Sequence, residues 1–204
     1  GDFAFECWIL AVKHAGTNNP NFMGICGSNS YTAGGILIQV NNTGPLRITI
    51  PLAAGGNLDQ SAGPELWGDG TSRNRDWNHI AVERSSGTLK GYVNGIEVIS
   101  TTHNVGVDFA HGGACNIGEN AYGTYAGDYP FRGYISNLRI CKGHIIYGQN
   151  FTPPSSPLSV HYTNENNKTS LLCCQNSDDP TQEATGKTIT AYGGADFSHN
   201  PDNL

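Results

Sequence analysis

Tyr92-Val93-Asn94-Gly95-Ile96-Glu97-Val98 places Asn-Gly between two short stretches in which apolar residues alternate with other residues. Both central residues of a type I′ turn need a positive φ, and Asn followed by Gly meets that need at little cost. The stretch therefore predicts a β-hairpin whose two strands lie within residues 89–98.

Strand-like alternation extends outward from this hairpin in both directions. In the first segment Phe3, Phe5, Cys7 and Ile9 share one face of the predicted strand. No window of a dozen residues free of Gly and Pro shows helical periodicity, so we expect an all-β chain. The predicted strands lie within 3–9, 36–40, 46–50, 77–84, 89–98, 114–117, 131–141, 170–174 and 187–192.

Nine or more short strands can bury their apolar faces by stacking as two sheets or by closing into a barrel. We favour a two-sheet antiparallel β-sandwich. The run Phe-Thr-Pro-Pro-Ser-Ser-Pro at 151–157 is stiff, and we expect it to lie extended across the outside of the sandwich.

The composition excludes several classes of partner. The chain has 204 residues with 27 Gly and 10 Pro, and its formal net charge is −6. A negative chain offers no electrostatic footprint for nucleic acid. No stretch approaches 18 uninterrupted apolar residues, so we expect no membrane insertion. The length fits one large all-β domain, and the first residue suggests a piece of something longer.

Six cysteines in a chain of this length are too sparse for a disulfide scaffold, and their spacing gives a zinc site little support. Cys7 and Cys141 lie in apolar strand patterns and are expected to be buried free thiols. Cys173 and Cys174 would point to opposite faces of a strand, so we expect no bond between them, although either could pair elsewhere. This usage suits a reducing compartment, with a secreted protein carrying one or two bonds as the alternative.

Four segments of the chain, taken in order, carry a family resemblance. They are Gly1-Asp2-Phe3-Ala4-Phe5-Glu6-Cys7-Trp8, Asp76-Trp77-Asn78-His79-Ile80-Ala81-Val82-Glu83-Arg84, Gly87-x-Leu89-Lys90-x-Tyr92-Val93-Asn94-Gly95 and Asn116-Ile117-Gly118. Together they resemble the laminin-G-like branch of the concanavalin A-like lectin/glucanase superfamily. The resemblance implies a concanavalin A-like jelly roll over residues 1–158.

The closing part of that region resembles a narrower group. Phe131-x-Gly133-Tyr134-Ile135-Ser136-Asn137-Leu138-Arg139-Ile140-x-Lys142-Gly143, then Tyr147 and Asn150-Phe151-Thr152-Pro153-Pro154, is similar to the last strand and tail of variants in bacteriophage virion proteins, especially those of marine and cyanobacterial phages. Residues 171–173 and 188–195 resemble the segment that joins one module to the next in multi-copy members. We therefore expect 159–204 to be an extension or linker with one or two strands, leading into a further module.

The resemblance implies a non-catalytic structural or adhesion module of a virion, such as a tail fibre, spike or capsid decoration. Its expected partners are other virion proteins, copies of itself as a homo-oligomer or tandem repeat, and host-surface carbohydrate. The alternative is a secreted or cell-surface carbohydrate-binding lectin or adhesin. Localisation on the virion surface follows from the first interpretation only.

Enzymatic function has no motif behind it. Glucanases of this fold need two carboxylates flanking the scissile bond, and this chain has no such cluster; Glu6, Glu83 and Glu97 are isolated in the sequence. His79 could act as a general base only beside an oriented partner, so we expect it to be a hydrogen-bonded packing residue. Trp77 and Tyr92 are expected to supply apolar area.

The segment 118–130 is the most suggestive ligand-binding loop. Aromatic rings stack on sugar rings while neighbouring amides and carboxylates bind the hydroxyls. Tyr-rich loops also make protein–protein contacts or fold back on a sheet, so that alternative stays open. The candidate glycan-binding residues are Asn120, Tyr122, Tyr125, Asp128 and Tyr129.

Calcium is the one cofactor that the sequence leaves open. Relatives of this fold often hold the ion in loops at one rim, and hard oxygen ligands occur here at Asp69, Asn120 and Asp128. Such residues also populate ordinary turns, and their spacing here is not diagnostic. No other cofactor is expected.

Overall fold

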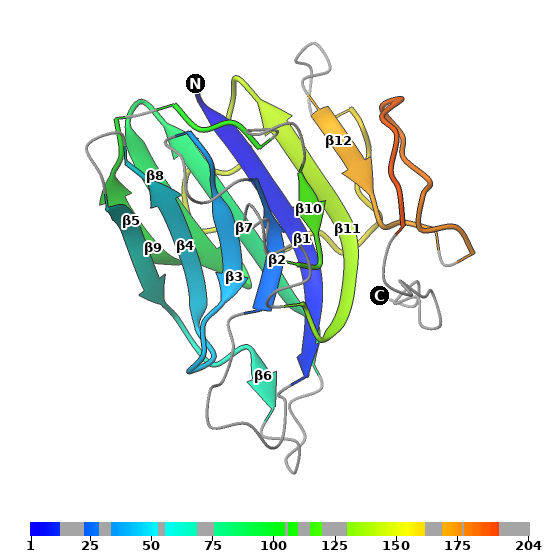
Figure 1. Cartoon of the computed structure of the whole chain (residues 1–204), viewed down its shortest axis with the longest axis horizontal. Helices are drawn as coiled ribbons and strands as arrows, with labels where there is room; N and C mark the ends of the chain where they lie inside the picture. The colour runs from blue at the N-terminus through cyan, green and yellow to red at the C-terminus, as the bar shows by residue number, and fades with distance from the viewer. Residues whose placement is uncertain are drawn as a thin grey trace.

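The computed structural model describes residues 1–12, 23–28, 34–52, 56–68, 76–104, 106–109, 115–119, 130–161, 169–176 and 178–191. These residues form two antiparallel sheets that stack face to face, as Figure 1 shows. The predicted all-β sandwich is confirmed. Within the described ranges no helix is long and apolar enough to cross a membrane.

The larger sheet has seven strands: six follow the order β12-β11-β1-β7-β8-β9, and the seventh, β6, pairs in parallel with the end of β1. The bounds are Phe3–Val12 for β1, Trp67–Gly68 for β6, Asn78–Ser85 for β7, Thr88–Val93 for β8, Ile96–Thr102 for β9, Gly133–Lys142 for β11 and Thr169–Cys173 for β12.

The smaller sheet has five strands in the order β10-β2-β3-β4-β5. The bounds are Met23–Gly27 for β2, Leu37–Val40 for β3, Leu46–Pro51 for β4, Asn57–Ala62 for β5 and Asn116–Ile117 for β10. We call the face of the larger sheet that points away from these strands the outer face.

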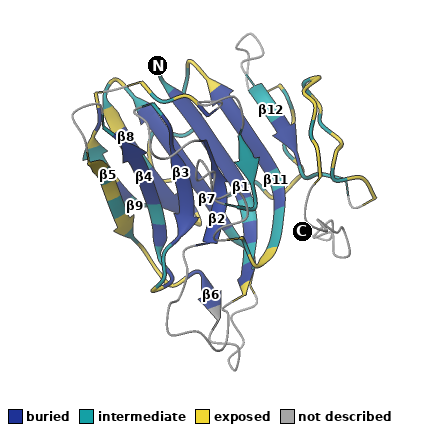
Figure 2. Ribbon diagram, viewed as in Figure 1, coloured by how far each residue is buried: buried dark blue, intermediate teal, exposed yellow. Residues whose placement is uncertain are grey.

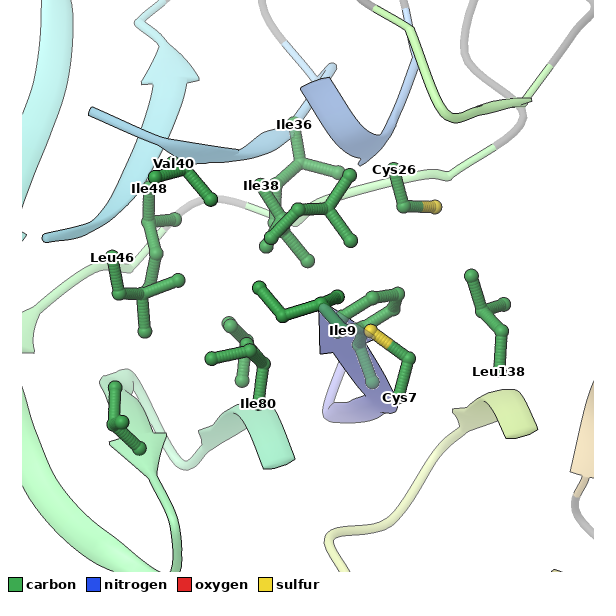
Figure 3. Packing of buried hydrophobic residues seen from close by; sticks show 14 of the residues in the cluster. Cys7, Ile9, Cys26, Ile36, Ile38, Val40, Leu46, Ile48, Ile80 and Leu138 are labelled. Carbon is green, nitrogen blue, oxygen red and sulfur yellow. The ribbon is translucent and has the colours of Figure 1, made fainter. Parts of the chain in front are cut away.

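The core lies between the two sheets and follows the predicted alternation. Ile9 and Ile80 of the larger sheet meet Ile38 and Ile48 of the smaller one in a single apolar cluster, shown in Figure 3. Each fully buried branched side chain contributes about 2 kcal/mol relative to an exposed one. Cys7 and Cys141 are buried free thiols, as predicted.

The Asn-Gly hairpin forms as predicted. Asn94 has a φ of 50° and Gly95 a φ of 79°, the double positive φ of a type I′ turn, and β8 and β9 flank it. Gly95 is required for a second reason, because a Cβ there would overlap the backbone carbonyl oxygen of Phe151.

The structure differs from the sequence predictions in several places. Strands β2, β5 and β6 were not predicted: β2 is only five residues long and two of these are glycine, and β6 has only two residues. Strand β5 has no apolar alternation to predict it, because it is an edge strand whose residues are half-buried or exposed (Figure 2). The strand expected at 187–192 is wrong over the described residues 187–191, which belong to no strand; the amide of Lys187 donates to the Glu183 carboxylate instead. Cys174 has a φ of 60° and so leaves the strand, which brings its Sγ to 3.6 Å from that of Cys173 rather than to the opposite face.

Residues 143–161, which we call the strap, cross the outer face as the Pro-rich run predicts. The Phe151 amide donates to the Gly95 carbonyl at 2.9 Å, and the Leu158 amide donates to Asn137 Oδ1 at 3.0 Å. The chain then returns as β12, which pairs with β11. The boundary between sandwich and extension at residue 158 stays a prediction.

Candidate functional site at one rim of the sandwich

Several segments of the chain contact the end of β1 at one rim of the sandwich. Val12 pairs with Gly68 of β6, and its amide donates to the carbonyl of Arg132 at 2.8 Å. Ala11 pairs with Gly133 at the start of β11. Figure 1 shows β6 and the end of β1 together at the lower end of the view. We call this end of the molecule, marked by Val12, Gly68 and Arg132, the rim.

A second set of backbone bonds adds the stem of segment 120–129. The Phe131 amide donates to the Gly118 carbonyl at 2.6 Å, and the Gly118 amide donates to the Ile25 carbonyl at 3.0 Å. The two ends of this segment are therefore held together beside β2 and next to Arg132. The described residues thus bring the stems of 69–75 and 120–129 to the same end of the sandwich.

The predicted site residues themselves lie outside the described residues. This applies to the glycan candidates and to the calcium candidates alike: Asp69, Asn120, Tyr122, Tyr125, Asp128 and Tyr129. Asp69 directly follows Gly68, and the other five lie between Glu119 and Pro130, so their chain neighbours mark the rim. Their roles stay predictions.

Trp67 is a rim residue that the sequence did not single out. Its side chain is 3% exposed, yet its Nε1–H has no hydrogen-bond partner among the described residues. A buried donor without a partner costs about 1–3 kcal/mol, so such groups are rare unless something else satisfies them. The orphaned donor lies two residues before Asp69.

Aromatic side chains lie near the rim on the outer face. Trp77, just before β7, and Tyr134 of β11 are half-buried, with ring centroids 6.5 Å apart and ring planes inclined by 45°. Trp77 therefore supplies apolar packing area, as predicted. Val12 is 46% exposed at the end of β1.

A buried polar cluster fixes the strap at the middle of the outer face. Glu6 Oε1 accepts hydrogen bonds from Arg139 Nε at 2.8 Å and from Arg139 Nη2, while Glu6 Oε2 lies 3.1 Å from His79 Nε2 and accepts the Tyr147 hydroxyl at 2.7 Å. Glu6 and His79 have no exposed surface, and Arg139 is 2% exposed. The prediction that His79 is a hydrogen-bonded packing residue is confirmed.

Glu83 holds the strap next to this cluster. Its carboxylate accepts the backbone amides of Ile146, Tyr147 and Gly148 at 2.6–2.8 Å. The Phe151 ring stacks on Tyr147 and meets the edge of Tyr92. Both carboxylates that looked isolated in the sequence are therefore anchors of the strap, and their oxygens are engaged beneath it.

Comparison with known proteins identifies the fold family. The family described as the concanavalin A-like lectin/glucanases superfamily, of the laminin G type, matches residues 1–145. The chain belongs to this superfamily. No curated protein matches the chain in sequence.

Several solved structures are similar to the chain. A Bacteroides ovatus protein whose assigned role is carbohydrate binding superimposes with a TM-score of 0.53 at 18% identity, covering 84% of this chain and 48% of that one. Domains LG4-5 of the mouse laminin α1 chain give 0.48 at 17% identity, covering 75% and 38%. The CBM40 of a Ruminococcus gnavus IT-sialidase bound to α2,6-sialyllactose gives 0.47 at 12% identity, covering 65% and 71%. The chain spans about half the length of the Bacteroides protein.

The described part of this concanavalin A-like domain contains no cluster of metal-ligating side chains. Within the described ranges no three His, Cys, Asp or Glu side chains are grouped so that they could hold an ion. Calcium at Asp69, Asn120 and Asp128 is left untested by this finding, because those residues lie outside the ranges.

A shallow hollow of about 450 Å³ opens where the strap meets β8 and β9. Its lining consists of Lys90, Glu97, Gln149 and Asn150. Lys90 Nζ lies 2.8 Å from Glu97 Oε2 and donates to the Gly148 carbonyl at 3.1 Å, while Asn150 Oδ1 accepts the Glu97 amide at 2.8 Å. Lys90, Glu97 and Asn150 therefore join β8 and β9 to the strap at this hollow.

Acid should weaken the attachment of the strap. Burial alone would raise the pKa of the Glu6 carboxyl, but the hydrogen bond from His79, the charge of Arg139 and the hydrogen bond from Tyr147 lower it below its ordinary value of 4.5. A lowered pKa gives stability that is present above the unfolded-state pKa and is lost as the pH falls through the folded-state pKa. We expect the free energy of unfolding, measured in urea, to fall below about pH 4.5, and to fall less steeply in Glu6→Gln. Equal pH slopes in the two proteins would contradict this.

Proposed function

We propose that this concanavalin A-like domain is a non-catalytic carbohydrate-binding module and that the sugar binds at the rim. The observation that carries the proposal is the convergence at Val12 of the stems of 69–75 and 120–129. Loops held on a rigid sandwich are common binding elements, because the scaffold positions their side chains while the loops vary freely.

The side chains expected at the rim suit a sugar. Tyr122, Tyr125 and Tyr129 offer flat apolar faces for a pyranose ring, while Asn120 and Asp128 offer partners for its hydroxyl groups. The buried Nε1–H of Trp67, without a partner among the described residues, is a further donor close to these stems.

Calcium is proposed as an accessory of the same site. Asp69, Asn120 and Asp128 carry hard oxygen ligands on two segments whose stems meet at the rim. An ion there would fix the two loops relative to each other and could itself bind sugar hydroxyls.

The non-catalytic part of the proposal rests on Glu6 and Glu83, two of the described carboxylates on the outer face. Glycoside hydrolysis needs two carboxyl groups that flank an accessible scissile bond. Glu6 and Glu83 are 0% and 2% exposed, and both lie beneath the strap with their oxygens engaged. They therefore have no free oxygen to offer a substrate.

The setting that we propose is a virion appendage or coat, with a secreted or cell-surface adhesin as the alternative. The resemblance of 131–154 to virion variants supports this setting, and the strap formed by part of that stretch is built into the sandwich. Many copies on one particle would turn weak single-site binding into firm adhesion to host-surface glycan. Neighbouring virion subunits are the other partners of this setting.

The proposal is tested by binding the purified domain, displayed multivalently, to a glycan panel with and without EDTA. We expect saturable binding that weakens about tenfold in Tyr122→Ala and Tyr125→Ala, because each change removes a stacking surface. If calcium takes part, EDTA and Asp69→Asn should weaken binding of the same glycan.

Asp179→Asn is the matched control, because it removes an exposed carboxylate from the C-terminal extension and should leave binding unchanged. Thermal unfolding of each variant separates lost binding from lost folding. Absence of saturable binding at every display density would overturn the carbohydrate proposal and leave an architectural module. Release of reducing sugar from a bound glycan would overturn the non-catalytic part.

A further inference from the structure

Cys26 and Cys115 bring their thiols together at the edge of the smaller sheet. Ile117 pairs with Cys26 in the β10–β2 ladder, so Cys115, two residues earlier, shares the face of Cys26 on the neighbouring segment. The two Sγ atoms lie 3.4 Å apart although 89 positions separate the residues in sequence. Figure 3 shows Cys26 at the margin of the core cluster.

We propose that Cys26 and Cys115 form a disulfide bond when the folded domain meets a small-molecule disulfide such as oxidised glutathione. A disulfide has an S–S length near 2.05 Å, so the sulfurs need to approach by only about 1.4 Å, within reach of small side-chain rotations. The bond would fasten the two-residue strand β10 to β2. This inference does not depend on the proposed sugar binding.

Access and acidity assign different roles to the two thiols. Cys115 is half-buried and can be reached from solvent, whereas Cys26 has no exposed surface. The hydrogen bond between the two thiols lowers the pKa of Cys115, against the effect of burial, and the same bond together with burial raises the pKa of Cys26. Cys115 is therefore the attacking thiolate and Cys26 the resolving thiol.

The exchange proceeds in two balanced steps. The Cys115 thiolate attacks one sulfur of oxidised glutathione, and the glutathione S–S bond breaks. One glutathione departs as a thiolate, and the other stays bound to Cys115 as a mixed disulfide. The Cys26 sulfur then attacks the Cys115 sulfur, the Cys115–glutathione S–S bond breaks, and the Cys26 proton passes to the second glutathione, which leaves as a thiol. Two protein thiols are oxidised, and one oxidised glutathione is reduced to two thiols.

The adjacent pair Cys173 and Cys174 provides a comparison within the same chain. Their sulfurs are 3.6 Å apart, almost as close as those of the proposed pair. Consecutive Cα atoms lie about 3.8 Å apart, shorter than the usual Cα separation across a disulfide, so a bond between neighbours is strained. We expect this pair to stay reduced under the same conditions.

The test exposes the folded 204-residue chain to excess oxidised glutathione, then alkylates free thiols in denaturant and maps the peptides by mass spectrometry. We expect the loss of two of the six free thiols and a linked peptide pair that contains Cys26 and Cys115. Because the bond closes a long loop, the oxidised protein should melt roughly 10 °C above the reduced one. Cys26→Ser and Cys115→Ser should abolish the shift, and Cys174→Ser should retain it.

Peptide mapping of the unmutated chain keeps the proposal falsifiable even if Cys26→Ser fails to fold. Six free thiols after exposure would overturn it, as would a Cys115 that keeps its glutathione without passing it to Cys26. A linked Cys173–Cys174 peptide in place of the Cys26–Cys115 pair would also overturn it.

Discussion

Glu6→Ala is expected to lower the free energy of unfolding by about 4 kcal/mol, because it removes the buried carboxylate that binds the Arg139 guanidinium, His79 and Tyr147. Arg139 is 2% exposed, and its Nη1 also donates to the Ser159 carbonyl at 3.1 Å. His79 and the Tyr147 hydroxyl lose the same acceptor. Urea unfolding followed by tryptophan fluorescence measures the loss.

Glu97→Ala is the matched control for this prediction. Glu97 is a half-buried carboxylate on β9 that pairs with Lys90 at 2.8 Å on the surface, where an ion pair contributes at most about 1 kcal/mol. We also expect Glu6→Gln to fall between the wild type and Glu6→Ala, since the amide keeps one acceptor for Arg139 but loses the charge. A loss in Glu6→Ala no larger than in Glu97→Ala would show that the strap does not depend on this cluster.

The elements that the sequence predicts well are those decided by neighbouring residues. Asn94-Gly95 specifies its own turn through backbone preference, and the alternation of Phe3, Phe5 and Ile9 specifies which face of β1 enters the core. The edge strand β5 escapes prediction because its ladder with β4 uses backbone groups and needs no apolar alternation. Cys174 escapes for a related reason, since its positive φ leaves no mark on the local pattern.

The polar cluster under the strap could not be predicted from the sequence. Glu6 and Arg139 are 133 positions apart, and they meet only because β1 and β11 pair in a register that sets them side by side. The strap itself was predicted from its prolines, but its anchors were not. The sequence does not distinguish a buried carboxylate from an exposed one. The difference appears only when its hydrogen-bond partners are located in the fold.

At the rim, the sequence indicates candidate residues but not which segments of the chain meet there. The Tyr-rich composition of 118–130 makes that segment a candidate for glycan binding, and the sequence names Asp69 in a separate segment as a calcium candidate. Nothing local indicates that Gly68 and Arg132 approach the same residue, Val12; that follows from the parallel β1–β6 pairing and the long-range contact with β11. Trp67 gives no sequence signal either, because its orphaned Nε1–H is defined by burial.

Gly133→Ala is expected to disrupt the rim and to cost about 4 kcal/mol, the sum of a backbone conformation that favours glycine and a steric overlap. Gly133 has a φ of 132°, and a Cβ built there would overlap the carbonyl oxygen of Leu10 on β1 and lie 2.9 Å from the carbonyl carbon. Because both groups belong to backbone, relief requires β11 to move away from β1 at the pairing of Ala11 with Gly133. A fall of about 12 °C in melting temperature is the measurable consequence.

Gly143→Ala separates the two contributions, because Gly143 directly follows the other end of β11. It also has a positive φ, 83°, but no atom lies within 4 Å of a Cβ built there, so we expect a loss of only about 1 kcal/mol. If the two variants lose equal stability, the close approach of β1 and β11 at the rim is not what requires glycine. If Gly133→Ala alone also loses binding of the glycan selected on the panel, at a temperature where it remains folded, then the stem geometry at Val12 and Arg132 is coupled to the site, as the proposed function requires.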